Sequence, residues 1–143
     1  MTLAYATSPV MDKKRRTAGN ILIYAAGLVL MGSACTKLVG VPAVVAQMSL
    51  LGLTDGRLTL VGLLEIFSAV LFIYPPVRSI GLLVVSSYLG GAICAHVQHG
   101  QYGAAFSPAM VLGLCWLGAY LRHPQVLWSF GSQPRQLEGE LSR

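Results

Sequence analysis

Four long apolar runs constrain this chain more than any other feature. They are Asn20–Leu38, Leu58–Tyr74, Ser79–Val97 and Ala104–Leu121. A helix rises 1.5 Å per residue, so about 17–20 residues are needed to cross a hydrocarbon core of roughly 30 Å. Because backbone groups in lipid must hydrogen-bond to one another, and because the runs do not alternate polar with apolar residues, each run predicts a membrane-spanning helix rather than a barrel strand.

The composition agrees with a membrane protein. Apolar residues make up 55% of the 143 residues and charged residues only 10%, against about 25% charged in ordinary globular domains. The formal net charge is +5, but no basic stripe or aromatic platform for nucleic acid is present, so nucleic-acid binding is not expected. The three cysteines lie inside apolar runs without a CxxC pair, which gives neither a disulfide framework nor a zinc site.

The lysines and arginines predict the orientation. Four spans place both termini on one side, and eight of the ten basic residues belong to that side. They are Lys13, Lys14, Arg15, Arg16, Arg78, Arg122, Arg135 and Arg143, against Lys37 and Arg57 on the other side. The positive-inside rule therefore places both termini in the cytoplasm. We expect a basic cytoplasmic tail over residues 1–18, a four-helix membrane domain over 19–122 and a cytoplasmic tail over 123–143, in the plasma membrane if the source is bacterial.

The connections fit an all-α, polytopic four-helix bundle. Pro75-Pro76 cannot continue a helix, so it predicts a tight turn between antiparallel second and third spans. His123-Pro124 ends the fourth span, and Trp128 and Phe130 suit a membrane interface. Between the first two spans, residues 41–55 are apolar but too short to cross, with Pro42 suited to start a helix. They predict a short interfacial or re-entrant helix, which is either a long connection or a lid.

A lipoprotein signal is the main rival for the first span. Basic residues, an apolar run and then Gly32-Ser33-Ala34-Cys35 resemble such a signal. However, the third position before the cysteine is glycine rather than an aliphatic residue, and the apolar run is longer than a usual signal core. We therefore expect the segment to remain as a span.

Glu65 is the residue that most suggests function. It lies about seven positions into the second apolar run, so about 10 Å below its outer end. A carboxylate facing lipid there costs several kcal/mol, so Glu65 must be neutral, paired or beside a polar cavity. Lys37, at the outer end of the first span, is its natural partner. Glu65 then acts as a general acid or base or a ligand anchor, or it only ties helices together.

His96 adds a second candidate, because antiparallel packing brings it to the same outer half as Lys37, Arg57, Glu65 and His99. Ser68, one turn from Glu65, adds a hydroxyl. We predict catalytic roles for Glu65 and His96, and ligand contacts from Lys37, Glu65, Ser68 and His96. A metal site of two histidines and Glu65 is only weakly indicated and no metal is predicted.

Two further patterns concern packing. Gly91-x-x-x-Ala95 and Ala109-x-x-x-Gly113 place small residues one turn apart, which predicts close helix approach. Tyr88, with the other aromatic residues of the spans, is expected to be a packing or interface residue.

Short motifs stand in a fixed order over residues 20–121. They are Lys37-Leu38, Pro42, Leu51-Gly52-Leu53, Gly62-x-x-Glu65, Pro75-x-x-Arg78 with Gly81, and Leu89-Gly90-Gly91-Ala92-x-x-x-His96. As a set, their order and spacing resemble the DoxX-like family of small four-helix membrane proteins. The resemblance implies a relation to quinone-linked membrane oxidoreductase subunits of thiosulfate oxidation. This chain has no soluble redox domain, cofactor-attachment motif or cysteine pair, which argues against thiosulfate oxidation itself.

These observations lead to three hypotheses. The first is a protein that binds a quinone-like or other lipophilic molecule in the outer half of the bundle, in support of membrane redox or envelope chemistry. The second is a membrane-embedded acid–base enzyme, an isomerase or cyclase, acting on an apolar substrate. The third is a structural or chaperone-like subunit that binds another membrane protein or a second copy through its small-residue faces. No cofactor is evident in the sequence, and a quinone is the one that the resemblance brings in.

Overall fold

The structure, a computed structural model, describes residues 9–123, with side chains from Lys13 onward, and no strand occurs among these residues. The elements in chain order are α1 (Pro9–Val39), α2 (Pro42–Ser49), α3 (Asp55–Ile73), η1 (Pro75–Val77), α4 (Arg78–Gln98) and α5 (Tyr102–Arg122). Four of them, α1, α3, α4 and α5, are long and apolar enough to cross a membrane. The predicted all-α fold with four membrane-spanning helices is therefore confirmed.

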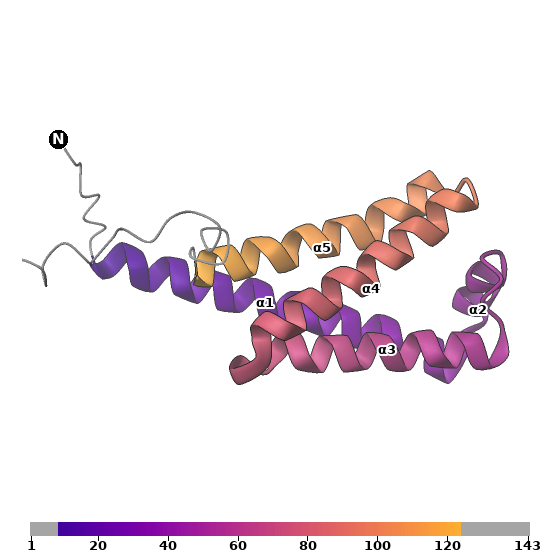
Figure 1. The fold of residues 1–143 in the computed structure, drawn as a ribbon, viewed down its shortest axis with the longest axis horizontal. Helices are drawn as coiled ribbons and strands as arrows, with labels where there is room; N and C mark the ends of the chain where they lie inside the picture. The colour runs from indigo at the N-terminus through magenta and orange to yellow at the C-terminus, as the bar shows by residue number, and fades with distance from the viewer. Residues whose placement is uncertain (1–8, 124–143) are drawn as a thin grey trace, which may run out of the picture.

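The four long helices pack in a ring. Helix α1 contacts α3 and α5, and α4 contacts the same two helices. The two prolines of η1 turn the chain sharply, so α4 runs back along α3 as predicted, and α5 returns beside α1 (Figure 1). We call the end that carries α2 and the α4–α5 loop the α2 end, and the opposite end, where α3 meets α4 and α5 finishes, the η1 end.

The core and the outer surface are both apolar. Ile23, Leu30, Phe72, Val85 and Cys115 are fully buried between the helices. Large apolar side chains such as Leu28, Leu83 and Phe106 point outward and stay well exposed. Apolar surface of this extent is unfavourable in water and favourable in lipid, so the chain is an integral membrane protein.

Helix α1 starts earlier than predicted. The first 18 residues were expected to form a tail, yet α1 begins at Pro9 and runs for 31 residues. Proline is favoured in the first turn of a helix, and lysine and arginine are good helix formers, so the basic segment continues the helix instead of ending it. The apolar run gives the length of the membrane span but not the first residue of the helix. Trp128 and Phe130 lie outside the described residues.

The connection after α1 contains the short helix α2, which begins at Pro42. Two glycines with positive φ bracket it, Gly40 at 75° and Gly52 at 70°, and this left-handed backbone is readily adopted by glycine. They let the chain leave α1 and enter α3 within a short distance. The position of α2 at the membrane interface stays a prediction.

Close helix approach uses other glycines than predicted. A Cβ added at Gly91 or Gly113 would meet no atom within 4 Å, so these small-residue faces do not bring helices together within the chain. A Cβ on Gly81 would instead collide with the α3 backbone, and one on Gly19 would lie 2.8 Å from the backbone nitrogen of Arg122. The prediction from spacing was wrong because small residues also occur where a helix faces lipid or a cavity.

Candidate functional site

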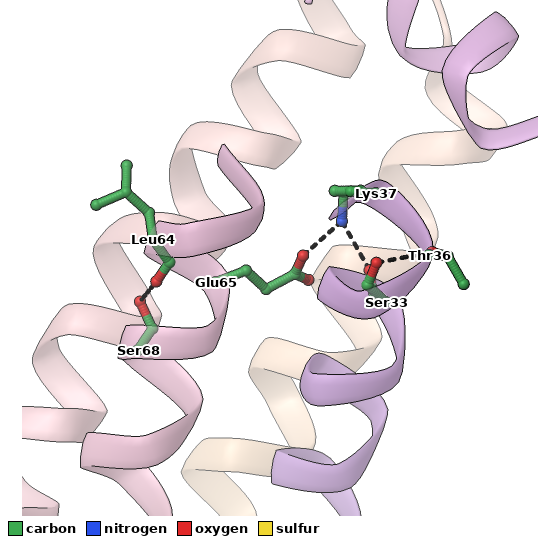
Figure 2. A network of polar contacts seen from close by, with 6 residues as sticks. All are labelled: Ser33, Thr36, Lys37, Leu64, Glu65 and Ser68. Carbon is green, nitrogen blue, oxygen red and sulfur yellow. Dashed lines mark hydrogen bonds and ion pairs between the residues drawn. The ribbon is translucent and has the colours of Figure 1, made fainter. Parts of the chain in front are cut away.

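A buried ion pair joins α1 to α3. The Lys37 Nζ lies 2.5 Å from the Glu65 Oε2, and it also donates a hydrogen bond to the Ser33 Oγ at 2.7 Å (Figure 2). Lys37 is 9% exposed and Glu65 is 3% exposed. The predicted partnership is therefore confirmed: the Lys37 stem does not carry the ammonium group out to solvent but turns it inward to the carboxylate.

Glu65 lies deeper than the apolar run suggested. It is ten residues after Asp55, the first residue of α3, which corresponds to about 15 Å along a helix of 19 residues. The run predicted about 10 Å because it began only at Leu58, after Asp55 and Arg57. The carboxylate thus sits near the middle of its helix, where an unpaired charge is most costly.

The ion pair lines a cavity of about 560 Å³ at the α2 end. This volume lies within the roughly 300–1,000 Å³ of small-molecule sites. Its walls come from all five α-helices and are mostly apolar, including Leu30, Met48, Leu51, Leu64, Leu89 and Val111. Its polar lining residues include Lys37, Glu65, Tyr88 and His96, together with Ser33, Thr36, Gln47, Ser87 and Ser107.

His96 is placed where the sequence predicted, on the same cavity as Glu65. It is 7% exposed, and its Nδ1 lies 3.0 Å from the Gln101 Oε1 in the α4–α5 loop. With that amide oxygen as the acceptor, Nδ1 carries the hydrogen. In a neutral imidazole this leaves Nε2 as a hydrogen-bond acceptor.

Tyr88 is the site residue that sequence reasoning missed. It was expected to be a packing or interface aromatic, yet it lines the same cavity as Glu65. The signal was present in the spacing. Tyr88 and His96 are eight residues apart, about two turns of α4, and so share one helix face.

Three other candidates lie elsewhere. Ser68 is 1% exposed but does not line the cavity; its hydroxyl donates to the Leu64 carbonyl at 2.6 Å, and Figure 2 shows it turned toward Leu64 rather than toward Lys37. Arg57 is exposed near the Gly52 carbonyl, and His99 is exposed with Nδ1 2.9 Å from the Ala95 carbonyl. Within residues 9–123, no three His, Cys, Asp or Glu side chains are placed to hold a metal ion.

Helix α5 contributes a backbone feature to the cavity. Pro108 lies inside α5 and has no N–H, so it cannot donate to the carbonyl of Ala104, four residues earlier. Both residues line the cavity. Besides this backbone feature, the cavity lining combines donors, on Lys37 and Tyr88, with acceptors, on Glu65 and His96.

This arrangement suits a ligand with an apolar body and one polar end. A model of the family described as DoxX-like matches residues 21–118, which include Lys37, Glu65, Tyr88 and His96. No curated protein and no solved structure matches the chain.

Proposed function

The chain belongs to the DoxX-like family, and from this premise we propose that it binds a quinone-like or other lipophilic small molecule in the cavity at the α2 end. The observation that carries the proposal is the buried Lys37–Glu65 pair opening on a mostly apolar cavity of about 560 Å³. If both termini are cytoplasmic, as the distribution of lysine and arginine predicts, this cavity lies in the outer half of the membrane. The proposed role is to hold such a molecule in support of membrane redox or envelope chemistry.

The polar end of the ligand supplies the affinity. A lipophile that moves from the bilayer into an apolar cavity exchanges one apolar surrounding for another, so it gains little hydrophobic free energy. Hydrogen bonds to charged groups contribute about 1.5–3 kcal/mol each. The polar residues of the cavity, above all Lys37, Glu65, Tyr88 and His96, are therefore the ones that distinguish a specific ligand from bulk lipid.

Each polar residue has a proposed role. Glu65 anchors the polar end of the ligand, and Lys37 neutralises the carboxylate and donates to ligand oxygen. Tyr88 bridges Glu65 and the ligand. His96, oriented by Gln101, presents Nε2 to a ligand hydroxyl. A quinone offers carbonyl acceptors and its reduced form offers hydroxyl donors, so both fit a site with donors and acceptors together.

The test is native mass spectrometry of the full chain released from mild detergent. Wild type is compared with Glu65→Gln, which removes the charge but keeps the shape, and with Ser68→Ala as a control one turn away and outside the cavity. We expect a bound lipophile on wild type and Ser68→Ala and at least tenfold lower occupancy on Glu65→Gln, as one lost charged hydrogen bond implies. An empty wild-type protein, or equal occupancy in all three, contradicts the proposal.

An acid–base enzyme is the second candidate. Its support is that Glu65, Tyr88 and His96 all line one cavity, so a proton taken from one position of a ligand can be returned to another. Under this hypothesis the bound molecule leaves as an isomer. Incubation in deuterated buffer followed by mass analysis of the extracted lipophile tests it: deuterium incorporated by wild type and lost in His96→Asn supports an enzyme, and none in wild type contradicts it.

A further inference from the structure

Arginines from three helices gather at the η1 end, opposite the cavity. We call Arg15, Arg16, Arg78 and Arg122 the arginine cluster. The Arg15 Nη2 on α1 lies 3.5 Å from the Tyr120 carbonyl oxygen, and the Arg15 guanidinium carbon lies 5.4 Å from the centre of the Tyr120 ring. Tyr120 is two residues before Arg122, so the basic segment of α1 packs beside the end of α5.

The guanidinium group of Arg122, at the η1 end, has one N–H donor without an acceptor. Its Nε is buried and has no hydrogen-bond partner among residues 9–123. The two helices are close here, because a Cβ on Gly19 would lie 2.8 Å from the Arg122 backbone nitrogen. A buried N–H of a charged group without an acceptor is unfavourable, so the site suits an acceptor oxygen from outside the described chain.

Three arginines of the cluster lower the pKa of one side chain, His123. The pKa of His123, just after α5, is lowered first by its partial burial and then by the positive charges of Arg122, Arg16 and Arg78. Charges from α1, α4 and α5 therefore reach the same side chain. Among the side chains that the structure describes, from Lys13 to His123, the one ion pair is Lys37–Glu65, so none of these side chains places a carboxylate against the cluster.

Arg78 is held in position but keeps free donors. Its Nε donates to the Phe72 carbonyl at 3.3 Å and its Nη2 donates to the Ile73 carbonyl at 3.1 Å, which caps the C-terminus of α3. A guanidinium group has five N–H donors, so three remain for another acceptor. The simplest alternative is that these arginines only cap helix ends and balance their dipoles.

We propose that the arginine cluster binds the phosphate group of an anionic lipid headgroup. The cluster stands at the ends of the membrane-spanning helices, which is the level of the headgroups, and on the face predicted to be cytoplasmic. Exposed apolar side chains continue from it along the same helices, Ile21 on α1 and Ile80 on α4. These offer a surface to acyl chains, so a lipid phosphate fits better than free phosphate, which shares the same chemistry.

The test is a lipid titration of the full chain in detergent, read by native mass spectrometry. The probes are phosphatidylglycerol and phosphatidylcholine with identical acyl chains. Arg16→Gln removes an exposed charge, Arg122→Gln removes the half-buried one whose Nε lacks an acceptor, and Arg57→Gln is the control at the α2 end. We expect wild type to prefer phosphatidylglycerol about tenfold, and each cluster variant to bind it about fivefold more weakly, with Arg57→Gln unchanged.

Three outcomes contradict the proposal that the arginine cluster binds a lipid phosphate. Equal binding of the two lipids by wild type, or equal losses in Arg57→Gln and Arg16→Gln, overturns the proposal. Displacement of phosphatidylglycerol by equimolar inorganic phosphate assigns the cluster to a free anion and overturns the lipid assignment. If Arg122→Gln does not fold, as measured by helical circular dichroism, the result for Arg16→Gln decides.

Discussion

Replacing Lys37 with methionine removes the buried ammonium group and keeps most of its stem. The ions are 2.5 Å apart, which at an effective dielectric constant of about 20 corresponds to a gross attraction of roughly 7 kcal/mol. Loss of water from each ion costs several kcal/mol and offsets most of that attraction. Lys37→Met leaves the 3%-exposed Glu65 without its cation, so we expect the free energy of unfolding to fall by about 3–5 kcal/mol.

The double substitution Lys37→Met/Glu65→Leu separates pairing from packing. It removes both charges, so no buried ion is left without a partner. We expect its stability to lie within about 2 kcal/mol of wild type, or above it. The assay is reversible unfolding in mixed micelles with increasing denaturing detergent, followed by far-ultraviolet circular dichroism, for wild type, the two single variants and the double variant.

Three results refute this reasoning. If Lys37→Met costs less than about 1 kcal/mol, the Glu65 carboxylate does not depend on Lys37. If the double variant is as unstable as Lys37→Met, the loss comes from packing of the lysine stem rather than from an unpaired charge. A coupling energy near zero in the double-mutant cycle likewise shows that the two side chains act independently.

Three shorter predictions follow from other features. Gly81→Ala should lower the free energy of unfolding by about 1–3 kcal/mol, because the added Cβ collides with the α3 backbone. Gly113→Ala, where the added Cβ meets open space, should leave stability unchanged or raise it. The unfolding assay described above compares the two variants, and equal effects contradict the packing argument. Tyr88→Phe should keep the fold and lose bound lipophile, because it removes the hydroxyl that we propose bridges Glu65 and the ligand. Unchanged occupancy by native mass spectrometry excludes that role. The pKa of His123 should lie below its ordinary value near 6.5 because of burial and neighbouring arginine charges. The unfolded chain then takes up the proton first as the pH drops, so the free energy of unfolding falls as the pH drops through 6.5. A His123 pKa of 6.5 or higher, measured by NMR titration, refutes the assignment.

Much of this fold follows from the length and composition of four segments. Hydrophobic length decides how many times the chain crosses, and antiparallel order then decides which residues share an end. This is why the pairing of Lys37 with Glu65 could be predicted from the sequence. A cation and a carboxylate, each costly to leave in lipid, lie on successive spans at the same end. His96 followed from the same ordering.

The remaining details depend on helix rotation, which hydropathy does not determine when a helix is apolar on every face. Ser68 and Glu65 are one turn apart, yet only Glu65 reaches the cavity. Tyr88 faces the cavity, although only its spacing to His96 distinguishes it in the sequence from the other tyrosines. Gly81 rather than Gly91 meets a neighbouring helix, because the tight turn at η1 forces α3 and α4 together where they meet.

The ion pair also bears on how the protein enters the membrane. Lys37 and Glu65 are 28 positions apart, so at about 5–20 residues per second the lysine is made roughly 1 to 6 seconds before the carboxylate. Before α3 is made, the long Lys37 side chain at the end of α1 can place its ammonium group at the membrane interface. Glu65 lies in the middle of α3, where its shorter side chain cannot reach the interface. An α1 already in the membrane therefore offers α3 a ready counter-ion during translocation, which makes the first span a template for insertion of the second.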